Sequence, residues 1–196
     1  MRLVLGTKNP GKLRELFQLA ADQENIQLEL APEEFNPEET GETFSENALI
    51  KAKSAAVLTN AYSLGEDSGI AVDALDGRPG IYSARYCEGS DDDRRHKLLA
   101  DLKLIPEGSR GAAYFCAMAL VAPDGRLLHQ TTGEWCGQIA FADSGNNGFG
   151  YDPVFFLPEL GKTVAELDSE TKNQLSHRAQ AWHKMLEFIH TSCEIQ

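Results

Sequence analysis

The chain opens with an apolar strand that passes through a glycine- and lysine-containing turn into a helix, and this join is the strongest constraint on its fold. The strand signal covers residues 2–5, the turn covers residues 6–12, and the helix signal starts at residue 13. Such a turn directs the free N–H groups of the helix into one small space, where the helix dipole favours an anion such as phosphate. Four side chains of the turn suit phosphate oxygens: Thr7, Lys8, Asn9 and Lys12. An ordinary strand-turn-helix connection with solvated lysines fits the same residues, and the segment lacks the Walker and dinucleotide-binding glycine spacings.

Strand and helix signals alternate through the rest of the chain, which predicts an α/β fold. A capping box at Thr43 and Glu46 predicts the start of an alanine-rich helix. The apolar run 112–122 and residues 127–141 flank a Pro-Asp-Gly turn and predict a long hairpin. Because hairpin and crossover connections occur together, we expect a mixed β-sheet flanked by helices, in a single domain over residues 1–196.

Composition limits the possible partners. With a formal net charge of −12, the chain lacks the basic footprint that a nucleic-acid backbone requires, although a small anionic ligand remains compatible with it. The longest apolar run is too short to cross a bilayer, so no membrane partner is expected. Four cysteines, Cys87, Cys116, Cys136 and Cys193, are widely scattered and contain no Cys-x-x-Cys pair. We therefore expect reduced thiols in a soluble cytoplasmic protein.

Two acidic segments contain candidate metal ligands. The first is the loop at Glu38-Glu39, and the second is Glu66-Asp67-Ser68-Gly69, expected as a turn between short strands at 62–64 and 70–72. Mg²⁺ prefers a few carboxylate oxygens and keeps positions open for substrate phosphates. A glutamate-rich loop can equally be a solvated surface feature. That alternative is weaker for Asp67, since strand ends commonly present functional side chains.

A glycine-rich loop over residues 143–153 places Phe149 and Tyr151 next to the carboxylate of Asp152. Exposed aromatic faces on such a loop suit stacking on a planar base. The alternative, a tight turn whose rings fill the core, fits the residues equally well.

The last helix is expected from about Asp168 to His190, with Leu175 in its apolar stripe. Ideal helix geometry then places His177 about 200° from Leu175, away from that stripe. A solvated histidine is one interpretation. The nearby Arg178 and Lys172 favour a contact with an anion or a carbonyl group.

Six segments taken in order have the features of one enzyme family. They are Thr7-Lys8-Asn9-Pro10-Gly11-Lys12, Glu38-Glu39-Thr40-Gly41 with Glu46-Asn47-Ala48, Glu66-Asp67-Ser68-Gly69, residues 79–86, Gly148-Phe149-Gly150-Tyr151-Asp152-Pro153, and Lys172 with Ser176-His177-Arg178. Together they span nearly the whole chain and resemble the inosine triphosphate pyrophosphatase family, which hydrolyses deaminated purine nucleoside triphosphates.

The resemblance implies an elongated mixed sheet in two lobes with a central substrate cleft, a homodimer, and Mg²⁺ as cofactor. It implies that ITP, dITP and XTP are cleaved to the nucleoside monophosphate and pyrophosphate. Glu38 and Asp67 resemble the metal ligands, Asp67 also the general base, and Ser68 a substrate contact beside it. The positions that resemble triphosphate contacts are Thr7, Lys8, Asn9, Pro10, Gly11, Lys12, Lys51 and Lys172. The positions that resemble base contacts are Phe149 as the stacking ring, Gly150, Tyr151, Asp152, His177 and Arg178.

Two other functions remain to be distinguished. A septum-inhibitor-type pyrophosphatase would prefer pyrimidine or modified nucleotides on a similar fold. A catalytically inactive nucleotide sensor would bind without turnover, but the chain retains Glu38, Asp67 and Lys12.

Overall fold

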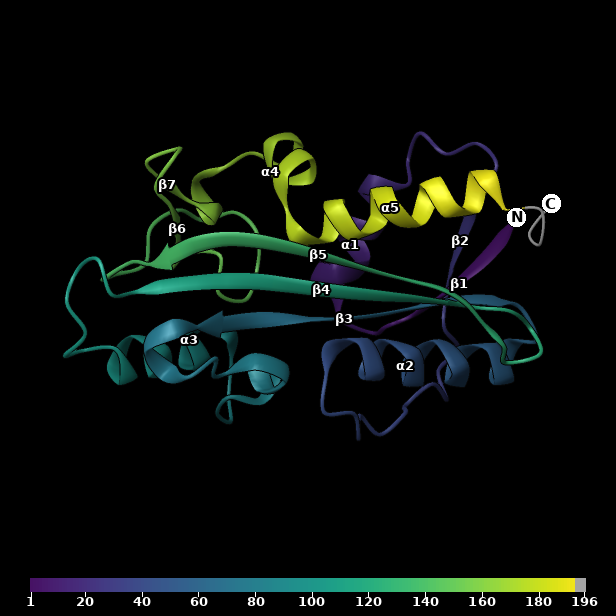
Figure 1. Cartoon of the computed structure of the whole chain (residues 1–196), viewed down its shortest axis with the longest axis horizontal. Coiled ribbons are helices and arrows are strands. Elements are labelled where there is room, and N and C mark those ends of the chain that lie inside the picture. Colours follow the sequence, from purple (N-terminus) through teal and green to yellow (C-terminus); the bar gives the residue numbers. More distant parts are fainter. Residues whose placement is uncertain (193–196) are drawn as a thin grey trace. The chain divides into compact units, whose positions relative to one another are not determined.

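The computed structural model describes residues 1–192 (Figure 1). In chain order the strands are β1 Arg2–Gly6, β2 Gln27–Leu30, β3 Tyr62–Val72, β4 Gly111–Val121, β5 Leu127–Ile139, β6 Phe155–Leu157 and β7 Lys162–Thr163. The α-helices are α1 Pro10–Leu19, α2 Phe44–Thr59, α3 Asp91–Asp101, α4 Ser169–Leu175 and α5 His177–Thr191, and 3-10 helices cover Asp73–Leu75, Gly80–Arg85 and Val164–Glu166.

These strands form one mixed sheet in the order β2-β1-β3-β4-β5-β6-β7, as predicted. Strand β1 pairs in parallel with β2 and β3, whereas β6 pairs antiparallel with β5 and β7. The chain divides into two compact units. Unit 1 contains Met1–Asp67, Cys116–Gly133 and His177–Gln196, and unit 2 contains Ser68–Phe115 and Glu134–Ser176.

Unit 1 is a three-layer arrangement whose two faces follow from the alternation of side chains along β4. Cys116, Met118 and Leu120 pack in the cluster that includes residues of α1 and α5. Ala117 and Ala119, which alternate with them, pack with the buried alanines of α2. Successive strand residues point to opposite faces, so β4 separates α2 from α1 and α5 (Figure 1).

Unit 2 has its own core beneath helix α3. Leu98 and Leu102 are fully buried there in one cluster with Ile70, Val72 and Phe155 of the strands. The helix begins at an N-cap serine, Ser90, whose side chain accepts from the N–H of Asp93 in a capping box. The core therefore holds α3 through Leu98 and through its C-cap residue Leu102, seven or more residues after Asp91.

The expected turn at Glu66-Asp67-Ser68-Gly69 is wrong, because β3 continues unbroken from Tyr62 to Val72. Helix α2 lies directly against this strand, and a Cβ at Gly65 would be 1.9 Å from the carbonyl oxygen of Ala48. Gly65 thus allows α2 to pack closely against β3 and does not mark a turn. The consequence for function is that Glu66 and Asp67 lie in the middle of a buried strand.

The single last helix expected from the sequence is also wrong. The chain forms α4 and then α5, with Ser176 extended between them at ψ 154°. Leu175 is 40% exposed and does not belong to the apolar stripe of α5, which contains Ala181, Trp182 and Met185. Because the helix is broken at Ser176, the angular relation assumed between Leu175 and His177 does not hold.

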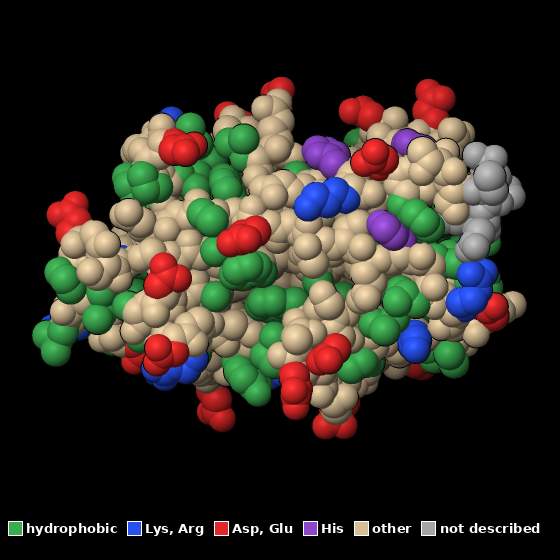
Figure 2. All heavy atoms as spheres, in the orientation of Figure 1, with side chains coloured by type: hydrophobic (Ala, Val, Ile, Leu, Met, Phe, Trp, Pro, Cys, Tyr) green, Lys and Arg blue, Asp and Glu red, His purple; other side chains and the backbone are tan. Residues whose placement is uncertain are grey.

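The surface agrees with the acidic composition. On the face drawn in Figure 2, acidic side chains are spread over the molecule and the few Lys and Arg side chains form no continuous patch. No helix within residues 1–192 is long and apolar enough to cross a membrane. Cys87, Cys116 and Cys136 are free thiols, and Cys193 lies outside the described residues.

Candidate functional site

Unit 1 holds a cluster of charged side chains centred on the two carboxylates of β3. Glu66 is fully buried and Asp67 is 5% exposed. Lys12 of α1 places its Nζ 3.0 Å from Glu66 Oε2 and 3.9 Å from Asp67 Oδ1. Lys51 of α2 donates to Asp67 Oδ1 at 2.7 Å and to Glu39 Oε1 at 2.8 Å. Two helices thus supply one ammonium group each to neighbouring carboxylates.

A third cation comes from α5. Arg178 is 1% exposed, and its guanidinium donates to Glu66 Oε1 at 3.1 Å and also binds the carboxylate of Glu15. The thiol of Cys116 contacts the same Glu66 oxygen at 3.4 Å. Four carboxylates, those of Glu15, Glu39, Glu66 and Asp67, therefore meet three cationic groups.

Burial and these ion pairs set the protonation of the cluster. Burial raises the pKa of Asp67, and the positive charges of Lys12 and Lys51 offset only part of that effect. For Lys51, burial opposes the charge, but the carboxylates of Asp67 and Glu66 outweigh it and raise the pKa. Burial also raises the pKa of the Cys116 thiol, so this thiol stays protonated at neutral pH. An aspartate with a raised pKa is suited to accept a proton.

The strand-turn-helix join positions Lys12. Asn9 is the N-cap of α1 and its Oδ1 accepts from the backbone N–H of Lys12 at 3.1 Å, while Pro10 occupies the first turn and Gly11 is buried. The hydroxyl of Thr7 accepts from the N–H of Asn9 at 3.2 Å. These contacts fix the start of α1 and the direction of its lysine.

Lys8 is exposed and does not join this cluster. Its Nζ donates to the carbonyl oxygen of Glu33 at 2.6 Å. Lys8 thus joins the segment after β1 to the segment after β2.

Asp67 has the features of a metal-binding carboxylate. Within residues 1–192, no group of three His, Cys, Asp or Glu side chains is arranged to hold a metal ion. Mg²⁺ at nucleotide sites takes only one or two protein carboxylates, the rest being water and phosphate oxygens. Asp67 Oδ2 fits this chemistry, because it is buried and has no hydrogen-bond partner in the described chain. Glu38 is exposed, whereas the neighbouring Glu39 is the one that reaches Lys51.

Unit 2 holds a second polar cluster around Asp152, which is 3% exposed. Its Oδ2 accepts from Lys172 Nζ at 2.5 Å and from the backbone N–H of Phe149 at 2.8 Å. Its Oδ1 accepts from the hydroxyl of Tyr114 at 3.2 Å. The Lys172 ammonium also lies 5.0 Å from the centre of the Phe149 ring. The structure therefore brings Lys172 to Asp152 and Phe149, in the unit that does not contain Lys12 and Lys51.

The two aromatic residues of the glycine-rich loop have different environments. Tyr151 is 6% exposed, packs in the core of unit 2 and donates its hydroxyl to the carbonyl oxygen of Ser83. Phe149 is half-buried. The core-filling interpretation thus describes Tyr151, and a stacking role is open to Phe149.

Two further predicted residues, Ser68 and His177, lie where the chain passes from one unit to the other. Ser68 is half-buried in β3 and starts unit 2. His177 starts α5 in unit 1 and is 4% exposed, so the solvated interpretation of this histidine is wrong. The backbone of α5 closely approaches β5 at this residue, since a Cβ at Gly133 would lie 2.0 Å from the carbonyl oxygen of His177.

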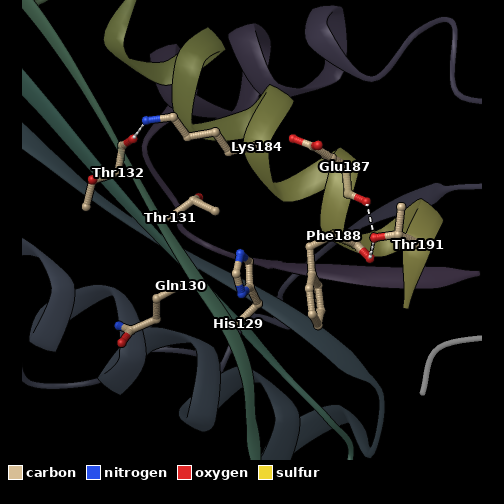
Figure 3. Close-up of a pocket in the computed structure, with 8 residues that line it drawn as sticks. All are labelled: His129, Gln130, Thr131, Thr132, Lys184, Glu187, Phe188 and Thr191. Atoms are coloured by element: carbon tan, nitrogen blue, oxygen red, sulfur yellow. Dashed lines mark hydrogen bonds between the residues drawn. The ribbon is translucent and has the colours of Figure 1, made fainter. Parts of the chain in front are cut away.

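Unit 1 also has an open pocket of about 510 Å³ that contains none of the predicted site residues (Figure 3). The rings of His129 and Phe188 stack in it at 4.2 Å, and Lys184 donates to the carbonyl oxygen of Thr132 at 2.7 Å. The charged cluster around Asp67 therefore remains the candidate site of unit 1.

One acidic residue of the cluster, Glu15, was not predicted. Glu15 follows Lys12 by three residues, so the two share one side of α1, and this spacing was a usable signal. Glu66 was predicted as a candidate metal ligand, but its burial was not predicted, because its segment was expected to be a turn.

Comparisons with known proteins place this geometry in a family context. The sequence model described as the Ham1 family matches residues 3–188. The chain is 50% identical over 184 residues to a dITP/XTP pyrophosphatase of Gloeobacter violaceus, covering 94% of this chain and 92% of that protein. It is 48% identical to a dITP/XTP pyrophosphatase of Yersinia pseudotuberculosis, covering 96% and 98%. It also resembles the solved structure of a HAM1 protein from Coxiella burnetii, with a TM-score of 0.86, 37% identity, and coverage of 98% and 100%.

The Arg178 ion pairs give a test of the cluster's stability. Replacing Arg178 by Met leaves Glu66 and Glu15 buried without this cation, so we expect the free energy of unfolding to fall by about 3–5 kcal/mol. Urea denaturation followed by circular dichroism measures this change. The matched control is Lys97→Met, which breaks an exposed pair with Asp101 and should cost about 0–1 kcal/mol. Equal losses in the two variants would contradict the importance of the buried network.

Proposed function

This chain belongs to the Ham1 family, and we propose that it hydrolyses deaminated purine nucleoside triphosphates (dITP, ITP and XTP) to the nucleoside monophosphate and pyrophosphate. The observation that carries the proposal is the buried Asp67 carboxylate, with one oxygen on Lys51 and the other without a protein partner. This arrangement combines a proton acceptor with positive charge, as hydrolysis of a phosphoanhydride requires. Relatives named dITP/XTP pyrophosphatase support the substrate class.

The residues of unit 1 would bind the triphosphate. Lys12 and Lys51 are ammonium groups that can exchange part of their carboxylate contacts for phosphate oxygens. Asp67 Oδ2 would accept the proton of the attacking water as its oxygen bonds to the α-phosphorus and the bond to the departing pyrophosphate breaks. Burial raises the pKa of Asp67, which makes its carboxylate a stronger base than that of an exposed aspartate.

We propose Mg²⁺ as the cofactor, held by Asp67 with Glu39 or Glu38 from the acidic loop. The residues fit this ion because Asp67 Oδ1 and Glu39 Oε1 lie 2.7 Å and 2.8 Å from the Lys51 ammonium, so two carboxylate oxygens already converge on one cation. When bound, Mg²⁺ neutralises charge that develops on the phosphate oxygens. Arg178 would hold Glu66 in place, so that Lys12 stays directed towards the phosphates.

The residues of unit 2 would recognise the base. Phe149 supplies the half-buried ring for stacking, next to the ammonium of Lys172. Lys172 has donors and no acceptor, so it suits the 6-oxo group of hypoxanthine or xanthine. The 6-amino group of adenine would leave donor facing donor, a mismatch of about 1–3 kcal/mol. Asp152 would orient this lysine, since both of its oxygens are already bound.

Two further properties belong to the same proposal. A homodimer in the cytoplasm is implied by the motifs shared with the inosine triphosphate pyrophosphatases. The free thiols of Cys87 and Cys136, which are half-buried and exposed, suit a reducing compartment. Light scattering after gel filtration would measure the oligomeric state.

Product analysis tests the proposed reaction. With Mg²⁺ present, the protein should convert ITP to IMP and pyrophosphate, and should turn over ATP at least about tenfold more slowly because of the mismatch at the purine 6-position. Ion-exchange chromatography separates the nucleotides, and a pyrophosphate-specific assay identifies the other product. Orthophosphate as the first product, or equal turnover of ITP, GTP and ATP, would refute the proposal. Preferential cleavage of dUTP or UTP would favour the septum-inhibitor type, and ITP binding without turnover would favour a sensor.

The role of Asp67 has its own test. Asp67→Asn should lower kcat by about 100-fold or more, because the amide cannot accept the proton, while ITP binding stays measurable. In the wild type, kcat/KM should rise with pH until Asp67 is ionised and then level off, with the midpoint above the ordinary aspartate value of 3.8 because burial raises this pKa. Steady-state rates across pH measure both effects. Full activity of Asp67→Asn would exclude this residue as the base.

A further inference from the structure

The backbone next to Phe149 is held on both sides by helix α3. The N–H of Gly150, the residue after Phe149, donates to Asp91 Oδ2 at 3.0 Å. The carbonyl oxygen of the same Gly150 accepts from Arg95 Nη1 at 3.1 Å. Both polar groups of this one peptide residue are therefore fixed by the first five residues of α3.

Arg95 also binds the beginning of the glycine-rich loop. Its Nε donates to Asp143 Oδ2 at 2.9 Å, and its Nη2 donates to Asp92 Oδ1 at 2.6 Å on the same helix. The Arg95 side chain is only 11% exposed, so its bonds are less screened than those of a surface ion pair. One guanidinium thus joins the two ends of the segment from Asp143 to Gly150.

The loop needs such restraint because of its sequence. Gly145, Gly148 and Gly150 all have positive φ, at 81°, 76° and 60°. Glycine has more backbone freedom than any other residue, so ordering this segment carries a large entropy cost. A ring that stacks on a base is effective only when it is already oriented.

We propose that Asp91 and Arg95 are positioning residues that hold the Phe149 ring ready for the nucleobase, an inference that rests on the proposed function. Neither residue takes part in the core of unit 2, where α3 packs through Leu98 and its C-cap residue Leu102. The helix start has its own capping box at Ser90 and Asp93. The bonds to Gly150 are therefore not needed to form the helix, and they serve the loop.

The test separates recognition of the base from binding of the phosphates. Arg95→Gln and Asp91→Ala should each raise KM for ITP by about tenfold, with kcat within about twofold of the wild type. The inhibition constant of inorganic tripolyphosphate, which lacks a base, should not change. Asp91→Asn retains an acceptor for the N–H of Gly150, so its KM should stay close to the wild-type value.

Lys97→Gln is the matched control. It removes a charged side chain from the same helix, where Lys97 pairs with Asp101 rather than with the loop, and it should leave KM unchanged. Thermal denaturation should show shifts of less than about 3 °C for all these variants. An unchanged KM in both Arg95→Gln and Asp91→Ala would overturn the inference. A parallel rise in the inhibition constant of tripolyphosphate would overturn it too, because the substitutions would then weaken phosphate binding as well as base binding.

The outcome distinguishes this inference from the proposed function. If the wild type releases no pyrophosphate from ITP, the proposed function fails. The dissociation constant of ITP, measured by calorimetry on the same variants, then decides the positioning role in place of KM. If the wild type is active and the variants bind ITP equally well, only the positioning role fails.

Discussion

Two adjacent carboxylates buried in the middle of β3 are the feature on which unit 1 depends. Burying an uncompensated charge costs several kcal/mol, so Glu66 and Asp67 require cations close by. Three helices of unit 1 each supply one: Lys12 from α1, Lys51 from α2 and Arg178 from α5. The helices must therefore pack against β3 in positions that bring these three cations to the buried carboxylates.

Small residues make this constraint possible. Gly65 lets the backbone of α2 approach β3 at Ala48, and Gly133 lets the backbone of α5 approach β5 at His177. The close approach of α2 and α5 allows Lys51 and Arg178 to reach the carboxylates of β3. Asp67 keeps one oxygen, Oδ2, outside this set of ion pairs, and that oxygen is the one available for chemistry.

Local signals in the sequence predicted most of the elements. Of the predicted site residues, Lys12, Lys51 and Asp67 lie together in the structure. The Thr43 capping box, the hairpin of β4 and β5, and the mixed sheet are all confirmed. The errors came from packing between distant segments. Residues 66–69 were interpreted as a turn although they lie within the continuous strand β3, and the break at Ser176 changed which side of the last helix His177 occupies. The contacts of Glu15 with Arg178 join residues far apart in the chain, which spacing along one helix does not reveal.

The account makes Asp67 the base for a water that attacks the α-phosphorus. Hydrolysis of ITP in water enriched in oxygen-18 directly tests which phosphorus is attacked, because the attacking oxygen remains on the phosphorus to which it bonds. Mass spectrometry after a single turnover should find the label in IMP and none in pyrophosphate. Label in pyrophosphate would place the attack on the β-phosphorus and contradict the account.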